Sequence, residues 1–159
     1  MKIEPATGAD AGEIMTLQRA AFLTDAQITG NPFLPSLTET VADLHAVIAD
    51  PEWIFLKATI GYRIVGSVRG HMADRVVDIG RLMTAPDQEG QGIGSALLNA
   101  IEEIAAPRVD WFELATGVDN ARNIAMYARR GYVEIERVEM SSGVVAVVMR
   151  KPAAELSTG

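Results

Sequence analysis

The sequence predicts an α+β protein with a mixed sheet of about seven strands flanked by about four helices, and three observations carry this prediction. Strand-length apolar runs alternate with segments whose apolar residues recur at helical spacing. The run Val144–Met149 is apolar throughout, which is typical of a strand covered on both faces. The chain has 159 residues, 48% of them hydrophobic, which is enough for one core in one domain.

The first fifty residues predict one strand and two helices. A short strand is expected at Lys2–Glu4, followed by a helix from Asp10 to Leu23. The stretch Thr24–Ser36 contains one glycine and two prolines and is predicted to be a loop. A second helix is expected over Leu37–Asp50, because Pro51 ends it.

Three strands and a patterned helix follow. Apolar runs and the turn residues between them predict strands at Trp53–Ile60, Arg63–Met72 and Val76–Thr84. The next helix begins near Ile93, stops before Pro107, and carries one apolar stripe at helical spacing: Ile93, Leu97, Ala100, Ile101 and Ile104.

The last third predicts a strand, a helix and two strands. These are expected at Trp111–Thr116, Asn120–Arg130, Tyr132–Val138 and Val144–Arg150, with Gly131 ending the helix. Residues 1–151 are therefore expected to form a single domain, and residues 152–159 a flexible tail.

Composition excludes several classes of function. The chain has 14 basic and 21 acidic residues, a formal net charge of −7, and no basic run longer than Arg129–Arg130, so we expect no nucleic-acid partner. With no cysteine and only two histidines, we expect no metal site. No apolar stretch reaches the roughly 18 to 20 residues that span a bilayer, so we expect no membrane contact and a cytoplasmic location.

The segment Glu89–Gly94 places glycines at alternate positions between a predicted strand and a predicted helix. Glycines let a ligand approach the backbone closely, and the first amides of a helix favour a phosphate or pyrophosphate. A flexible turn with a glycine-rich cap is the alternative. A P-loop is excluded because no lysine precedes Ser95, and a dinucleotide fingerprint because Leu97 stands where its third glycine is needed.

A second landmark follows from Asn120 to Tyr132. The pattern Leu82-x-Thr84-x-Pro86, then Gly90-x-Gly92-x-Gly94, then Asn120, Tyr127 and Gly131-Tyr132 resembles the GNAT superfamily of acetyl-CoA-dependent N-acetyltransferases. The resemblance covers the chain from about Val76 to Arg150 and implies the GNAT fold, in which two central parallel strands splay apart.

The resemblance also implies roles for individual residues. Acetyl-CoA is the implied cosubstrate, with its pyrophosphate on the amides of the glycine loop and its pantetheine arm along the preceding strand. Asn120 resembles a residue that contacts the pantetheine or orders the loop before the last helix, although it also suits a helix N-cap. Tyr127 resembles the general acid, although a helical tyrosine commonly serves packing. The implied cofactor-binding residues are Leu82, Met83, Thr84, Glu89, Gly90, Gln91, Gly92, Ile93, Gly94, Ser95, Asn120 and Tyr127.

The chain departs from the family pattern at two positions. Glu89 stands where relatives usually have arginine or glutamine, and a carboxylate beside a pyrophosphate weakens its binding. Ala115 stands where many relatives carry a glutamate base. Glu113, two residues earlier on the same strand face, and Asp78 on the neighbouring strand are therefore the candidate bases, with His71 as a further one.

The resemblance also implies an acceptor pocket formed by the first two helices, their connection and the final hairpin. Phe22, Phe33, Leu34 and Leu37 would form an apolar wall, and Asp25 or Glu39 would attract an ammonium group; Arg69 and Arg81 would touch acceptor or cofactor unless they are solvated strand charges. Asp43, Glu102 and Glu103 are expected on solvated helix faces.

The sequence thus favours direct acetyl transfer from acetyl-CoA to a primary amine of a small molecule or peptide, with no acyl-cysteine step because the chain lacks cysteine. A catalytically weakened acyl-CoA-binding regulatory module is the alternative, motivated by Glu89 and Ala115. A homodimer is a further expectation of the resemblance.

Overall fold

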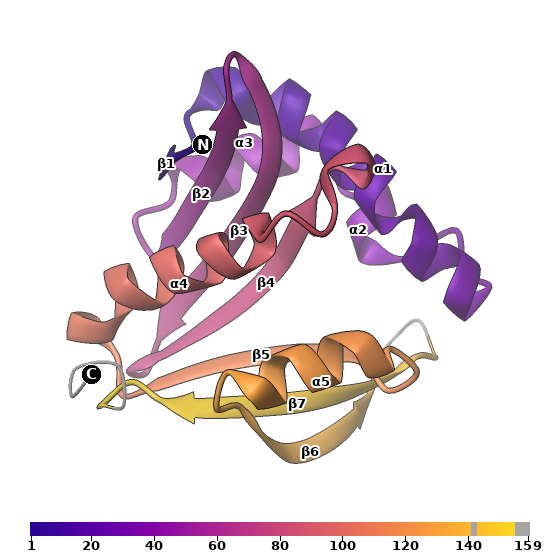
Figure 1. The fold of residues 1–159 in the computed structure, drawn as a ribbon, viewed down its shortest axis with the longest axis vertical. Coiled ribbons are helices and arrows are strands. Elements are labelled where there is room, and N and C mark those ends of the chain that lie inside the picture. The colour runs from indigo at the N-terminus through magenta and orange to yellow at the C-terminus, as the bar shows by residue number, and fades with distance from the viewer. Residues whose placement is uncertain (141–142, 155–159) are drawn as a thin grey trace.

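A computed structural model of the chain describes residues 1–140 and 143–154. It contains one seven-stranded mixed sheet of order β1-β2-β3-β4-β5-β7-β6 (Figure 1). The predicted strands are all present, with ends shifted by no more than two residues. Their bounds are β1 Lys2–Pro5, β2 Trp53–Ile60, β3 Arg63–Ala73, β4 Val76–Thr84, β5 Trp111–Gly117, β6 Val133–Glu139 and β7 Val145–Pro152.

The central strands β4 and β5 are the parallel pair of the sheet, and they separate part-way along. Their pairing runs only from Val76 with Trp111 to Ile79 with Leu114. Beyond these residues β4 continues to Thr84 and β5 to Gly117 without pairing to each other. The predicted splay is therefore confirmed, and it opens a gap at the carboxyl ends of both strands.

Helices cover both faces of the sheet, as predicted. Helices α1 and α3 pack on one face, around a core that includes Ile14, Leu44 and Phe55. Helix α4 packs on the other face, and α5 lies over β5 and β7 (Figure 1). The helices are α1 Ala11–Thr29, α2 Pro35–Thr38, α3 Val41–Ala49, α4 Ile93–Ala105 and α5 Ala121–Arg129, with short 3₁₀ turns η1 Gly8–Asp10, η2 Pro86–Gln88 and η3 Ala106–Arg108.

Two glycines of β3 let α4 approach the sheet closely. A Cβ atom on Gly66 would lie 2.8 Å from Ile93 and 2.9 Å from Leu97, and one on Gly70 would lie 3.0 Å from Ile101. Ile93, Leu97 and Ile101 follow one another at four-residue spacing, so one stripe of α4 rests on the glycine side of β3. This contact fixes where α4 begins.

The predicted stripe of α4 is partly wrong. Ile104 is 44% exposed, whereas Leu98 and Ala105 are fully buried. Glu102 lies on the same buried side at 1% exposure, so its predicted solvation is wrong too. The buried side of α4 thus extends toward Leu98, Glu102 and Ala105, and a buried cation on β7 pairs with the Glu102 carboxylate.

That cation is Lys151, whose Nζ lies 2.5 Å from a carboxylate oxygen of Glu102. The hydroxyl of Tyr132 donates to the same oxygen at 3.2 Å, and the Arg130 guanidinium lies 3.6 Å from the other oxygen. A buried carboxylate is tolerated when it is paired and hydrogen-bonded in this way. The cluster ties α4 to β7 and to the end of α5.

The predicted loop Thr24–Ser36 is wrong at both ends, because α1 continues to Thr29 and α2 already begins at Pro35. Gly30, with φ 69°, ends the helix in the left-handed conformation that glycine adopts readily. The predicted helix Leu37–Asp50 is also divided into α2 and α3. Thr40 begins α3 with a capping box, in which its hydroxyl accepts from the amide of Asp43 and its own amide donates to the Asp43 carboxylate.

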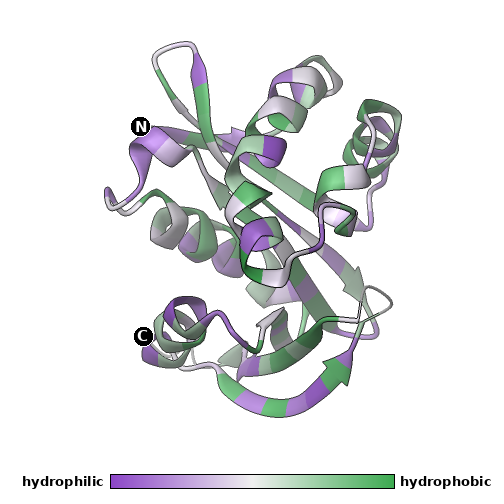
Figure 2. Ribbon diagram, turned by 90° about the vertical axis from the view of Figure 1, so that its right-hand side faces the viewer, coloured by the Kyte–Doolittle hydropathy of each residue, from purple (hydrophilic) through white to green (hydrophobic). Residues whose placement is uncertain are grey.

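The C-terminal strands extend the domain past Lys151. Pro152 pairs with Trp111, and the amide of Ala153 donates to the carbonyl of Asp110 at 2.9 Å. Residues 155–159 of the predicted tail lie outside the described part of the chain. Strand β7 is buried from Ala146 to Met149, as its sequence predicts, while β6 is the exposed edge, where charged and apolar residues alternate (Figure 2).

Candidate active site

A groove of about 700 Å³ runs from the end of β4 across the glycine loop to α5. Helix α1 forms part of its wall through Phe22 and Asp25. Of the residues that the sequence predicts for cofactor binding, Gln91 alone does not line it. The others do: Leu82, Met83, Thr84, Glu89, Gly90, Gly92, Ile93, Gly94, Ser95, Asn120 and Tyr127.

The glycine loop turns into α4 through two left-handed residues. Gly90 and Gly92 both have φ 79°, a conformation that residues with a Cβ adopt rarely. A Cβ atom on either would meet no protein atom within 4 Å, so the space beside the loop is open. The amides of Ile93, Gly94 and Ser95 begin the helix and have no acceptor one turn earlier. This end of the groove therefore fits an anion such as a diphosphate.

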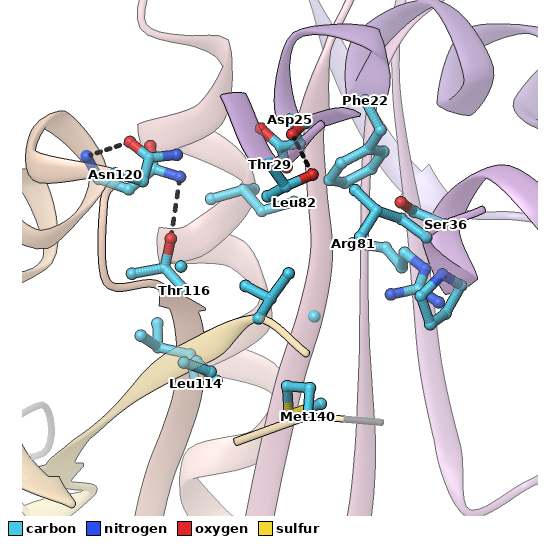
Figure 3. A pocket seen from close by; sticks show the side chains of 18 of the residues that line it. Phe22, Asp25, Thr29, Ser36, Arg81, Leu82, Leu114, Thr116, Asn120 and Met140 are labelled. Atoms are coloured by element: carbon cyan, nitrogen blue, oxygen red, sulfur yellow. Dashed lines mark hydrogen bonds between the residues drawn. The ribbon is translucent and has the colours of Figure 1, made fainter. Parts of the chain in front are cut away.

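A second cavity of about 400 Å³ occupies the gap between β4 and β5 (Figure 3). Phe22, Asp25 and Thr29 border it from α1, Arg81 and Leu82 from β4, and Leu114 and Thr116 from β5. Leu34, just before α2, and Ser36, in α2, also line it, as does Met140 after β6. Of the residues predicted for the acceptor wall, Phe22 and Leu34 line this cavity, whereas Leu37 does not, and Phe33 is 77% exposed and does not line it either.

The groove and the second cavity meet at Tyr127 and Asp25, which line both. Tyr127 is 6% exposed, and no residue of the described chain hydrogen-bonds its hydroxyl. Burial, followed by the negative charge of Asp25, raises the pKa of Tyr127 to about 12. The phenol therefore keeps its proton at neutral pH, which suits a proton donor.

Asp25 lies in the part of α1 that the sequence predicts as loop. Burial raises the pKa of its carboxyl group. Its main-chain carbonyl accepts from Thr29 at 2.9 Å, and within the described residues its carboxylate has no ion-pair partner. It therefore lies where a cationic amine would be stabilised, as the sequence analysis expected for Asp25 or Glu39.

The Glu39 carboxylate, unlike that of Asp25, is already paired with other side chains. Its carboxylate accepts from Gln18 at 2.8 Å and from Arg69 at 2.7 Å. Burial alone would raise the pKa of Glu39, but these hydrogen bonds and the charge of Arg69 lower it below its usual value. The expected attraction of an ammonium group to Glu39 is wrong, because the carboxylate is already neutralised.

The two carboxylates predicted as bases occupy neighbouring positions in the β4–β5 pair, but only one reaches the cavity. Asp78 lines it, and burial and the charge of Glu113 raise the pKa of Asp78, while His71 lowers it. Glu113 does not line the cavity. Arg150 donates to it twice, at 3.0 and 2.6 Å.

Asn120 begins α5, and its side-chain oxygen accepts from the amide of Asn123 at 3.1 Å. The prediction that Asn120 is a helix N-cap is therefore confirmed, and Asn120 also lines both cavities. Asn123 in turn donates to Thr116 at 3.4 Å, which ties the start of α5 to β5.

Sequence reasoning missed one cation of the groove. Arg122, in the first turn of α5, lines the same wall as the glycine loop. Its position two residues after Asn120 was the available signal, since both then lie at the start of one helix. Its guanidinium places a positive charge along the same groove as the Glu89 carboxylate.

The family model of the Acetyltransferase (GNAT) family matches residues 17–132, which spans α1 to the end of α5. The chain belongs to the GNAT acetyltransferase family. The resemblance found in the sequence is thereby confirmed, and the glycine loop and Tyr127 fall within the matched region.

Solved GNAT structures share this fold at low sequence identity. A ribosomal-protein-alanine N-acetyltransferase from Brucella melitensis matches with a TM-score of 0.79 and 19% identity, over 96% of this chain and 99% of that one. The PaiA N-acetyltransferase from Thermoplasma acidophilum, in complex with coenzyme A, matches with a TM-score of 0.77 and 15% identity, over 95% and 98%.

A curated relative, the UPF0157 protein YqkA of Bacillus subtilis (strain 168), is 26% identical over 142 residues. The match covers 87% of this chain, which spans 39% of the relative's length. Within residues 1–140 and 143–154, no helix combines the length and apolarity that crossing a membrane requires.

Proposed function

We propose that this GNAT domain transfers the acetyl group of acetyl-CoA to a primary amine by direct attack in a ternary complex. The observation that carries the proposal is the meeting of two cavities at Tyr127: a groove with a helix N-terminus for the cosubstrate, and a separate cavity for the acceptor. One phenol thus lies beside both reactants, which is the positioning that a bimolecular transfer needs.

Acetyl-CoA supplies the acetyl group as a thioester, whose carbonyl carbon bonds to the amine nitrogen as the carbon–sulfur bond breaks. The amides of Ile93, Gly94 and Ser95 and the guanidinium of Arg122 suit its diphosphate. Residues 80–84 of β4 lack a strand partner on the β5 side, so their main chain is open to a pantetheine arm bound like an added strand.

The proposed acid and the candidate bases lie on different elements: Tyr127 on α5, Asp25 on α1 and Asp78 on β4. Asp25 or Asp78 accepts the proton that the attacking amine must lose, since both carboxylates line the acceptor cavity with raised pKa values. Tyr127 donates its phenolic proton to the departing sulfur, which leaves as a thiol. Glu113 keeps its ion pair with Arg150 and acts on Asp78 through its charge.

A weakened acyl-CoA-binding regulatory module is the second candidate. Two features favour it: the exposed carboxylate of Glu89 at the glycine loop, and Ala115 in the acceptor cavity where many relatives carry a base. The uncommitted hydroxyl of Tyr127 argues for catalysis.

Thiol release from acetyl-CoA across a panel of amino acids, polyamines, aminoglycosides and peptides separates the two. We expect at least one amine to raise thiol release well above the amine-free rate. If acetyl-CoA binds, yet no amine releases thiol, the chain is a binding module. If acetyl-CoA does not bind, both candidates are wrong.

A further inference from the structure

A buried cluster of two arginines and one glutamate lies beside the acceptor cavity, and of its three residues Arg81 alone lines that cavity. Arg69 on β3, Arg81 on β4 and Glu39 at the end of α2 approach one another there, and their side chains are 7%, 26% and 14% exposed. The two arginines pair unequally with Glu39, and this difference identifies the arginine that can still bind a ligand.

Glu39 is committed to Arg69. The Arg69 guanidinium donates to Glu39 at 2.7 Å and lies over the rings of Trp53 and Phe55, at 5.5 and 5.9 Å from their centres. Gln18 holds the other Glu39 oxygen at 2.8 Å. Nη1 of Arg69 also lacks an acceptor in the described chain, but Arg69 lines neither the acceptor cavity nor the cosubstrate groove, so it is not placed to bind the acceptor.

Arg81 is the arginine of this cluster that pairs less closely with Glu39. Its Nε forms an ion pair with Glu39 at 3.6 Å, beyond hydrogen-bond length, and this buried nitrogen has no hydrogen-bond acceptor in the described chain. The side chain lines the acceptor cavity and not the cosubstrate groove, close to Ser36 in Figure 3. Neither Asp25 nor Asp78, in the same cavity, forms an ion pair with it within residues 1–140 and 143–154.

The backbone at Arg81 is strained, and such strain is consistent with a side chain that faces a binding cavity. Arg81 has φ 49°, in the left-handed region that non-glycine residues rarely adopt. Between the pairs Ser67–Met83 and Arg69–Gly80, one residue of β3 stands opposite two of β4, which is a β-bulge. Bulges and left-handed residues of this kind cluster at functional sites, where they redirect a side chain.

We propose that Arg81 binds the carboxylate of the acceptor, so that the preferred substrate is a small amino acid and not a simple amine. A single carboxylate neutralises the one surplus charge of the cluster and accepts two hydrogen bonds from the guanidinium fork. The amine of the same molecule then lies toward Asp25 and Tyr127. The cavity of about 400 Å³ suits a molecule of this size.

This inference rests on the proposed acetyl transfer, and a panel of matched acceptors tests it. Glycine, β-alanine and 4-aminobutyrate are each compared with the corresponding amide, which has the same amine and no negative charge. For the best pair we expect wild-type kcat/KM to favour the acid by about tenfold or more, since a charge-assisted bidentate contact is lost in the amide.

Substitution of Arg81 tests whether this residue causes the preference for acids over amides. In Arg81→Gln the acid-to-amide ratio of kcat/KM should fall to near one, because the acid loses more than the amide does, and Arg81→Lys should retain part of the preference. Arg108→Gln, at an exposed arginine of η3, is the matched control and should keep the wild-type ratio. The thermal midpoint of Arg81→Gln should not fall, because Glu39 keeps Arg69.

Calorimetric binding of N-acetylglycine and N-acetylglycinamide gives a readout that needs no turnover. Tighter binding of the acid to wild type than to Arg81→Gln supports the anchor even if no amine releases thiol, in which case only the proposed transfer fails. Equal wild-type use of acids and amides, or equal losses for both in Arg81→Gln, would overturn the assignment of Arg81.

Discussion

The carboxylate of Asp25, near the end of α1, and the phenol of Tyr127, in α5, line the same two cavities, and the charge of Asp25 helps to raise the pKa of Tyr127. The two helices lie far apart in the sequence. Because both side chains line both cavities, we expect the acceptor and the cosubstrate to react between them.

The first prediction concerns the Tyr127 hydroxyl. Tyr127→Phe should lower kcat by about tenfold or more, because the departing sulfur loses its proton donor. The affinity for acetyl-CoA should stay within about twofold of wild type, since the ring and its packing remain. Tyr62→Phe, at a fully exposed tyrosine, is the matched control for both values. An unchanged kcat would remove Tyr127 from the reaction.

The second prediction concerns pH and Asp25. Its pKa is raised in the folded state, so the native protein holds this proton more tightly than the unfolded chain does, and stability falls as pH rises through the two pKa values. Asp25→Asn should therefore raise the thermal midpoint at pH 8 and flatten its decline above pH 4.

Asp43→Asn serves as the control of opposite sign. Hydrogen bonds from the amide and hydroxyl of Thr40 lower the pKa of Asp43, so this carboxylate stabilises the fold above its unfolded pKa and the gain is lost on acidification. Its substitution should lower the midpoint at pH 8. Identical responses of the two variants would contradict the surroundings assigned to Asp25.

The third prediction concerns Glu89. Replacing it with glutamine removes a negative charge beside the proposed diphosphate site, so acetyl-CoA should bind about two- to fivefold more tightly at low salt. The gain should shrink as ionic strength rises, which titration at two salt concentrations measures. Glu103→Gln, an exposed carboxylate farther along α4, should leave the affinity unchanged.

The fourth prediction concerns the seat of α4 on β3. Gly66→Ala should destabilise the protein by about 1–3 kcal/mol in urea unfolding, because the new methyl group meets Ile93 and Leu97 below 3.0 Å. Because Ile93 begins α4, the acetyl-CoA affinity should also fall. Gly12→Ala, where a Cβ meets nothing within 4 Å, should be neutral or stabilising by up to about 1 kcal/mol.

The fifth prediction concerns the buried Glu102. Glu102→Ala leaves Lys151 buried without its carboxylate and should cost about 3–5 kcal/mol of unfolding free energy. Tyr132→Phe removes one hydrogen bond while Lys151 stays paired, so about 1 kcal/mol is expected. Glu103→Ala, one residue along and exposed, should change stability by about 0.5 kcal/mol or less. A small loss in Glu102→Ala would contradict the pairing.

The strands, the glycine loop and the helix cap at Asn120 were predictable because each depends on local chemistry. Alternation, turn residues and a capping side chain act within a few residues of the chain. The splayed parallel pair and the role of Tyr127 came from the family resemblance, since no local pattern specifies them.

The burial of Glu102 and the pairing of Glu39 were not predictable in the same way. Each depends on a cation from a distant strand, Lys151 in one case and Arg69 in the other. A signal for Glu102 did exist, since it lies four residues after Leu98 and three before Ala105, on the buried stripe of α4.

The end of α1 was predicted wrongly, and the left-handed backbone of Arg81 was not predicted at all, for another reason. Gly30 and two prolines mark a loop without fixing its first residue, so the helix that carries Asp25 was ended too early. The left-handed conformation of Arg81 has no local signature, because arginine rarely adopts it and the bulge is imposed by pairing with β3.

A crystal structure of the protein with coenzyme A would show whether the start of α4 binds the diphosphate and whether the sulfur reaches Tyr127. We expect diphosphate oxygens that accept hydrogen bonds from the amides of Ile93, Gly94 and Ser95, and a sulfur within hydrogen-bond distance of the Tyr127 hydroxyl. A diphosphate bound away from the start of α4, or a sulfur directed away from Tyr127, would contradict this expectation.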